Sequence, residues 1–312
     1  MLDILGKRYY FFALSLLVIL PGLIILAING LPLAIDFSGG TILELQFPTT
    51  SLPPTEEVVQ IYNELGFREV QVQTAAGPSG QRDILVIRSP FMDEEAKNKV
   101  VSAMEERFGV EQITVNRFDS VGPVIAAQVT NRAALAVAVA ALAVVLYITY
   151  AFRGIPHAFR YGVCAIIAMI HDILVVFSIT GIGSVLWGWQ MDSLFLTALL
   201  TVIGFSTQDK IVVFDRIREN SSFLRKLPFE KLANHSIVQT LQRSINTQLM
   251  TVEFMLLALA LFGGVTLREF AVILLVGLFS GTYSSIFVAA PILVVWENKE
   301  WRTWFRKQNA SA

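Results

Sequence analysis

The chain has 312 residues and a formal net charge of -1 at pH 7. Its residues are 54% hydrophobic and 16% charged, with a mean hydropathy of +0.60, which is too apolar for an ordinary soluble domain. This composition indicates an integral membrane protein, and the lack of a basic domain argues against nucleic-acid binding. A lone cysteine, Cys164, excludes a disulfide framework within the chain.

Apolar runs of about 20 residues, long enough to cross a bilayer as helices, recur six times along the chain. The first run has no cleavage pattern after it, so we expect it to remain as a membrane anchor. The predicted spans are Tyr9–Ile28, Ala133–Phe152, Phe159–Ile182, Leu194–Phe214, Leu241–Phe262 and Phe270–Val295.

The segment between the first two spans has the patterning of a separate soluble domain. Alternating residues predict strands and a helical period predicts helices, with a hairpin turn at Gly77–Gln81. The predicted elements are strand Thr41–Phe47, helix Thr55–Leu65, strands Glu69–Thr74 and Asp83–Arg88, helix Asp93–Phe108 and strand Glu111–Phe118. This βαββαβ order is typical of an α+β ferredoxin-like domain.

Lysine and arginine collect before the first span, between the second and third, between the fourth and fifth, and after the sixth. Short loops rich in these residues stay in the cytoplasm, so both termini are expected inside and residues 36–121 outside. The predicted organisation is a tail with transmembrane helix 1 (residues 1–35), an extracytoplasmic domain (36–122), transmembrane helices 2–6 (123–297) and a cytoplasmic tail (298–312).

Two opposite charges fall within predicted spans. Asp209 lies in the fourth span, and Arg243 lies near the start of the fifth. In antiparallel neighbours each would lie about 9 Å from the cytoplasmic flank, at one depth. A carboxylate beside a cation in a bilayer can carry a proton if water reaches it alternately from each side. The alternative is a static ion pair that fixes helix register.

Further polar residues lie in the apolar runs. His171 and Asp172 are adjacent on one predicted helix and point about 100° apart, so they are not expected to face one cavity. They would form either a second proton relay or a structural hydrogen bond from Asp172 to a neighbouring helix. Lys210 is expected to extend its long stem toward the cytoplasmic headgroups.

Small residues recur every four positions in the sixth span, at Gly277, Gly281 and Ser285, where another helix of this bundle or of a partner can approach closely. Enzyme chemistry finds little support. The sequence has no glycine-rich phosphate loop, no clustered metal-ligand spacing, and no nucleophile with a base. We therefore expect neither catalysis nor a cofactor or metal.

Several short motifs together resemble one family. They occur in order between Tyr9 and Glu297, so the resemblance covers nearly the whole chain. The motifs are Asp36-Phe37-Ser38-Gly39-Gly40, Val121-Gly122-Pro123, His171-Asp172, Ser206-Thr207-Gln208-Asp209 leading into Phe214-Asp215-Arg216-Ile217-Arg218-Glu219, and Thr240-Leu241-Gln242-Arg243. The chain resembles the smaller member of the SecD/SecF protein-export pair, membrane proteins of the resistance-nodulation-division type.

Three residues depart from that family's pattern. Gln208 stands where the family usually has asparagine, Lys210 replaces a small or hydroxyl residue, and Glu253 replaces an apolar residue in the fifth span. A lysine beside Asp209 and an additional carboxylate would retune the proton site or take over part of its role.

The resemblance implies a six-helix half bundle in the bacterial plasma membrane, completed by a SecD subunit. The pair would assist late polypeptide translocation using the proton motive force. The implied partners are SecD, the SecY/SecE/SecG channel, the unfolded polypeptide in transit and membrane lipid, with SecA and YajC as further candidates. The alternatives are a proton-driven exporter of lipids or small molecules, and a scaffold subunit with no coupling of its own.

Overall fold

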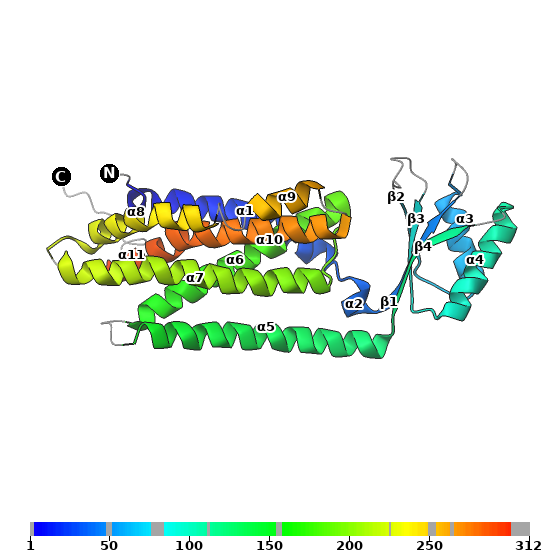
Figure 1. Ribbon diagram of the computed structural model, residues 1–312, viewed down its shortest axis with the longest axis horizontal. Coiled ribbons are helices and arrows are strands. Elements are labelled where there is room, and N and C mark those ends of the chain that lie inside the picture. The colour runs from blue at the N-terminus through cyan, green and yellow to red at the C-terminus, as the bar shows by residue number, and fades with distance from the viewer. Residues whose placement is uncertain are drawn as a thin grey trace, which may run out of the picture. The chain divides into compact units, whose positions relative to one another are not determined.

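A computed structural model describes residues 3–47, 52–75, 84–110, 113–153, 158–224, 226–248, 254–262 and 265–300. The chain divides into two compact units (Figure 1). One comprises residues 33–134, and the other comprises residues 1–32 and 135–312. The boundary between residues 134 and 135 falls inside a helix that begins at Pro123.

The smaller unit is built on an antiparallel four-stranded sheet. Its elements follow the predicted βαββαβ order, preceded by the short helix α2 (Ile35–Ser38). The strand order is β2-β3-β1-β4. The elements are β1 (Gly40–Gln46), α3 (Thr55–Glu64), β2 (Gln71–Ala75), β3 (Ile84–Ser89), α4 (Glu94–Phe108) and β4 (Thr114–Val121).

Helices α3 and α4 share one face of this sheet (Figure 1). Alternate residues of the central strands, such as Leu43 and Ile87, are fully buried and pack in one cluster with Tyr62 of α3 and Met104 of α4. Such alternation is what a sheet with one covered face requires. Both helices therefore cover the same face of the sheet. The predicted hairpin turn at Gly77–Gln81 lies outside the described residues.

Strand β4 runs three residues beyond its predicted end because it continues to pair with β1, as far as the partners Gly40 and Val121. Gly40 has a φ of +121°, and a Cβ there would lie 2.8 Å from the carbonyl oxygen of Ser89. Glycine avoids both the strain and the clash. The motifs around Gly39 and Pro123 thus meet where β1 begins and β4 ends, and a Cβ on Gly39 would lie 3.5 Å from Pro123 Cα.

The larger unit is helical. Within the described residues, five helices are long and apolar enough to cross a membrane. They correspond to five of the six predicted spans. The five spans are formed by α1 (Arg8–Asn29), α5 (Pro123–Ala151), α6 (Ala158–Trp187), α7 (Ser193–Phe223) and a last span in which α10 (Val265–Ser284) continues through a π-helical turn at Ser285–Ala289 into α11 (Ala290–Glu297). Two further helices are α8 (Phe229–Gln248) and α9 (Phe254–Phe262).

The remaining predicted span, Leu241–Phe262, coincides with the end of α8 and with α9. Residues 249–253, between those helices, lie outside the described residues. Helix α5 begins ten residues before its predicted start. Gly122 and Pro123 start it, and its first turns are polar enough to escape a search for apolar runs.

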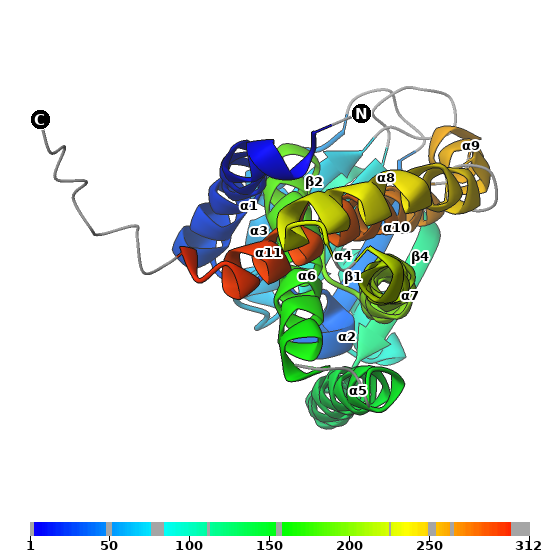
Figure 2. The ribbon, with the colours of Figure 1, turned by 90° about the vertical axis from the view of Figure 1, so that its left-hand side faces the viewer.

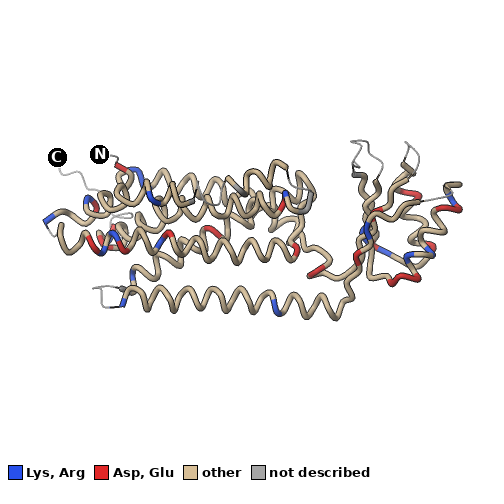
Figure 3. Tube along the Cα trace, viewed as in Figure 1, with Lys and Arg blue, Asp and Glu red and all other residues tan. Residues whose placement is uncertain are grey.

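Helix α6 lies at the centre of the bundle, between α1 and α7 (Figure 2). Small residues allow close approach: a Cβ on Gly22 of α1 would overlap the backbone of Ser178 of α6. The middle of the bundle carries few charges, and lysines and arginines collect at one end of its helices (Figure 3). The charged residues that are buried in the bundle, Asp172, Asp209 and Lys210, are therefore candidates for a functional site.

Candidate functional site

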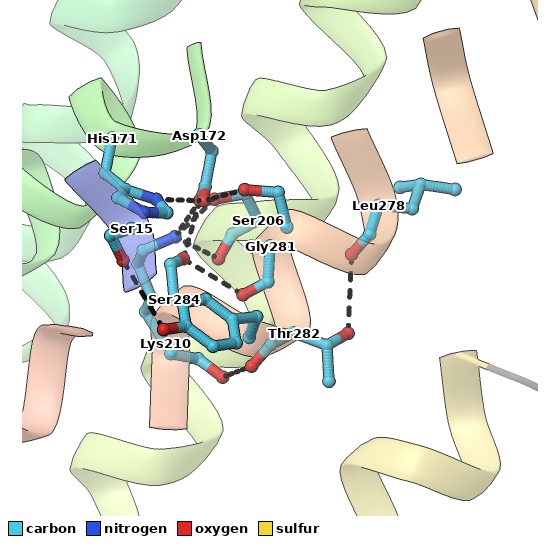
Figure 4. A network of polar contacts seen from close by, with 12 residues as sticks. Ser15, His171, Asp172, Ser206, Lys210, Leu278, Gly281, Thr282 and Ser284 are labelled. Carbon is cyan, nitrogen blue, oxygen red and sulfur yellow. Dashed lines mark hydrogen bonds and ion pairs between the residues drawn. The ribbon is translucent and has the colours of Figure 1, made fainter. Parts of the chain in front are cut away.

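A buried carboxylate joins three helices at the centre of the bundle (Figure 4). Asp172 of α6 is 1% exposed. It accepts hydrogen bonds from Ser280 at 2.8 Å and Ser284 at 2.7 Å, both on α10, and from Ser206 of α7. The structural role considered for Asp172, a hydrogen bond to a neighbouring helix, is therefore realised with two helices at once.

Lys210 of α7 supplies the opposite charge. It is 1% exposed, and its Nζ lies 2.7 Å from Asp172 Oδ2. Its other acceptors are the carbonyl oxygen of Ser206, at 3.2 Å, and the Ser206 hydroxyl. The expectation that Lys210 reaches toward the cytoplasmic headgroups is wrong. Its ammonium instead pairs with a carboxylate inside the bundle, so neither buried charge is left unpaired.

His171 also reaches the carboxylate, with Nδ1 3.1 Å from Asp172 Oδ1. Although adjacent residues point about 100° apart around a helix, the His171 side chain turns back toward the carboxylate of its neighbour. The imidazole stacks on Tyr283 of α10 at a ring distance of 6.1 Å. Its Nε2 is buried and has no hydrogen-bond partner among the described residues.

Asp209 is the second buried carboxylate, 7% exposed, and it lies on a different face of α7 from Lys210. It accepts a hydrogen bond of 3.0 Å from Thr282 of α10. Residues 209 and 210 differ by about 100° around a helix, so one turn of α7 presents a carboxylate and an ammonium to different neighbours. The two centres are linked through α10, which supplies partners to both.

Arg243 of α8 is exposed, and within the described part of the chain no ion pair joins it to Asp209. Gln239 Oε1 of α8 accepts from Arg216 Nε at 2.7 Å and from Asn220 Nδ2 at 2.9 Å, so polar contacts join α7 and α8 nearer the C-terminal end of α7. That Asp209 and Arg243 lie at one depth stays a prediction.

Gln208 is exposed beside a cavity of about 590 Å³ between α5 and α7. Its lining is mainly apolar and includes Val144 and Tyr147 of α5 and Gly204 and Ile211 of α7. Glu253, the additional carboxylate of the fifth predicted span, lies outside the described residues.

The small residues of the last span pack within the chain's own bundle. A Cβ on Gly281 would lie 3.2 Å from Ser206 Cα, and one on Gly277 would overlap Val202, so both glycines face α7. Ser285 is buried and donates to the carbonyl oxygen of Thr282. These glycines bring α10 close enough for Ser280 and Ser284 to reach Asp172.

The remaining motif residues lie away from the buried charges. Asp36 is part of α2, while Asp215 and Arg216 lie toward the C-terminal end of α7. Asp215 pairs with Arg218 at 2.6 Å, and Arg216 pairs with Glu219 at 2.5 Å. Exposed pairs of this kind contribute little stability, so their placement fits a solvated helix end.

Among the described residues the bundle holds two buried carboxylates: Asp172, which pairs with Lys210, and Asp209, which accepts a hydrogen bond from Thr282. No cluster of three or more potential metal ligands occurs among the described residues. The serines that surround Asp172 were not predicted as site residues. Ser206 stands four residues before Lys210, and Ser280 and Ser284 are four apart, so helical spacing was the available signal.

Comparison with known proteins places this geometry in context. A family model described as "Protein export membrane protein SecD/SecF, C-terminal" matches residues 100–299. A second model, the SecD/SecF GG motif, matches residues 24–48, which include Gly39 and Gly40.

Several proteins match along nearly their whole length. "Protein translocase subunit SecF" from Anaerolinea thermophila is 66% identical over 307 residues, 98% of each chain. The protein of the same name from Thermobaculum terrenum is 46% identical and is covered to 99%. The crystal structure of SecDF from Thermus thermophilus, a translocon-associated membrane protein, has a TM-score of 0.78 and 32% identity over 95% of this chain. The chain spans 39% of the length of that SecDF chain.

Proposed function

The chain belongs to the SecD/SecF family of protein-export membrane proteins, and from that premise we propose that it couples proton movement to late polypeptide translocation. The full-length similarity to SecF subunits carries the assignment to protein export. The buried Asp209 carboxylate supports the coupling, because a carboxylate inside a bilayer is costly and its protonation changes the charge of the bundle.

In this proposal Asp209 binds and releases the proton, and Thr282 holds the carboxylate by its hydrogen bond. Arg243 acts as a partner that approaches when α8 moves relative to α7. Formation of that pair would favour the ionised carboxylate, and its opening would favour the protonated one. Gln208 of α7 and His171 of α6 are auxiliary polar groups, and Glu253 is a further candidate carboxylate.

The proposed architecture is a six-helix half bundle with a ferredoxin-like extracytoplasmic domain. The second half comes from a SecD subunit, as in the SecDF protein, where both parts belong to one chain. Helix α5 supports such a partner: between Leu135 and Ala151 its one buried residue is Ile148. We further propose an inner-membrane location with both termini in the cytoplasm, and association with the SecY/SecE/SecG channel.

The test uses inverted membrane vesicles that contain the channel, SecD and this chain. We expect an imposed proton gradient to speed the completion of translocation of a half-translocated polypeptide, and we expect a protonophore to remove that gain. Vesicles without this chain are the control and should show no gain. Equal gains with and without the chain would refute the proposal.

A further inference from the structure

Lys210 occupies a position built from oxygen atoms. Its ammonium contacts Asp172 Oδ2 at 2.7 Å, the Ser206 carbonyl oxygen at 3.2 Å and the Ser206 hydroxyl. An ammonium has three donors and no acceptor, so these contacts match its capacity. A carboxylate, a backbone carbonyl and a hydroxyl are also the ligands that hard metal cations prefer.

The charge balance of this locus depends on the lysine. Asp172 and Lys210 are each 1% exposed and form an ion pair. Among the described residues at the centre of the bundle, the other contact of this kind is the one between His171 and Asp172. Loss of the ammonium would leave a carboxylate buried in a bilayer, with the hydroxyls of Ser206, Ser280 and Ser284 still directed at it. An uncompensated buried charge is strongly destabilising, so a mobile cation would be drawn in.

We propose that Lys210 is a tethered cation that fills a binding site for a monovalent alkali ion, Na⁺ or K⁺. The chain carries the cation covalently, so this locus keeps one charge state whatever ions surround the membrane. Asp172 is then removed from ion exchange, and Asp209 is left as the titrating group. The inference concerns the Asp172 locus itself and holds whether or not Asp209 couples protons to export.

The test removes the ammonium and offers free ions in its place. Full-length Lys210→Met in lipid nanodiscs is unfolded by heat at alkaline pH in choline chloride, NaCl or KCl of equal ionic strength. Choline is too large for the site. The controls are the parent protein, Lys226→Met, which removes an exposed lysine, and the double variant Lys210→Met with Asp172→Asn, which removes the carboxylate as well.

We expect NaCl or KCl to raise the unfolding midpoint of Lys210→Met by roughly 3 °C over choline chloride, as for a ligand at about ten times its dissociation constant. The parent, Lys226→Met and the double variant should show no such difference. Equal midpoints for Lys210→Met in all three salts would overturn the proposal, because a proton would then neutralise Asp172.

A second variant at the same position keeps the proposal testable if Lys210→Met does not fold. Lys210→Gln keeps a polar group near the oxygens, and its yield of monodisperse protein is compared after extraction in the same salts. A higher yield in NaCl or KCl than in choline chloride supports the proposal. Equal yields, or failure of both variants to fold in every salt, contradict it, since a bound cation should replace the ammonium.

Discussion

The Asp172 and Lys210 side chains show how a charge pair is accommodated inside an apolar bundle. Each charge costs several kcal/mol to bury, and the pair offsets this only when the remaining donors and acceptors are satisfied. Here three serine hydroxyls and one backbone carbonyl complete the set. The pair therefore fixes the relative positions of α6, α7 and α10.

A double-mutant cycle tests this coupling. We expect Asp172→Asn alone to lower the free energy of unfolding by about 3–5 kcal/mol, because it leaves a buried ammonium without its counter-charge. The double change Asp172→Asn with Lys210→Met should cost clearly less than the sum of the two single changes. Denaturation in mixed detergent micelles measures all three. Additive losses would show that the two side chains do not interact.

Residue patterns predicted which charged residues are buried, but they did not predict which of these residues form ion pairs. Asp209, Asp172 and Lys210 were all recognised as lying within spans, since that follows from hydropathy alone. The partner of Lys210 was missed, because it lies 38 positions away on another helix. Chain spacing within one helix cannot supply that information.

At the scale of elements, the contact between α7 and α10 places the site. Gly277 and Gly281 allow the two helices to approach so closely that a Cβ at either position meets α7. The α7 and α8 contact follows its own register, set by Arg216 with Gln239 and by Asn220 with Ser236. The positions of five long helices were predictable from apolar runs, although α5 begins ten residues earlier and α7 ends nine residues later than predicted. Register was not, because it depends on these individual polar contacts.

A glycine pair on the two helices provides a matched comparison. Gly281→Leu should lower the free energy of unfolding by about 1–3 kcal/mol, since the new side chain would separate α10 from Ser206. Gly204→Leu should be nearly neutral, because a Cβ there meets nothing within 4 Å and faces the cavity beside α5. Thermal unfolding in detergent checks both. Similar losses for the two variants would rule out the packing role given to Gly281.

At the scale of the molecule, the sheet unit and the helical unit differ in the residues that they bring together. In the sheet unit, Gly39, Gly40, Gly122 and Pro123 meet where β1 begins and β4 ends, and the helical unit holds the buried charges. The element order of the sheet unit was predictable because its strands alternate cleanly and each helix has one apolar face. The count of membrane helices was less accessible, since Leu241–Phe262 mixes polar and apolar stretches.

The central claim is that protonation of Asp209 drives export, and gradient-driven translocation by Asp209→Asn tests it most directly. The amide keeps the volume of the carboxyl group and can still accept from Thr282, but it cannot cycle a charge. Asp209→Glu, which can cycle its charge, and Asp215→Asn, at the solvated end of α7, are the controls. We predict that Asp209→Asn inserts and co-purifies with SecD, but translocates polypeptide no faster with a proton gradient than without one. Asp215→Asn should keep the parental increase in translocation rate, and Asp209→Glu should keep part of that increase. A parental gain in Asp209→Asn would contradict the account.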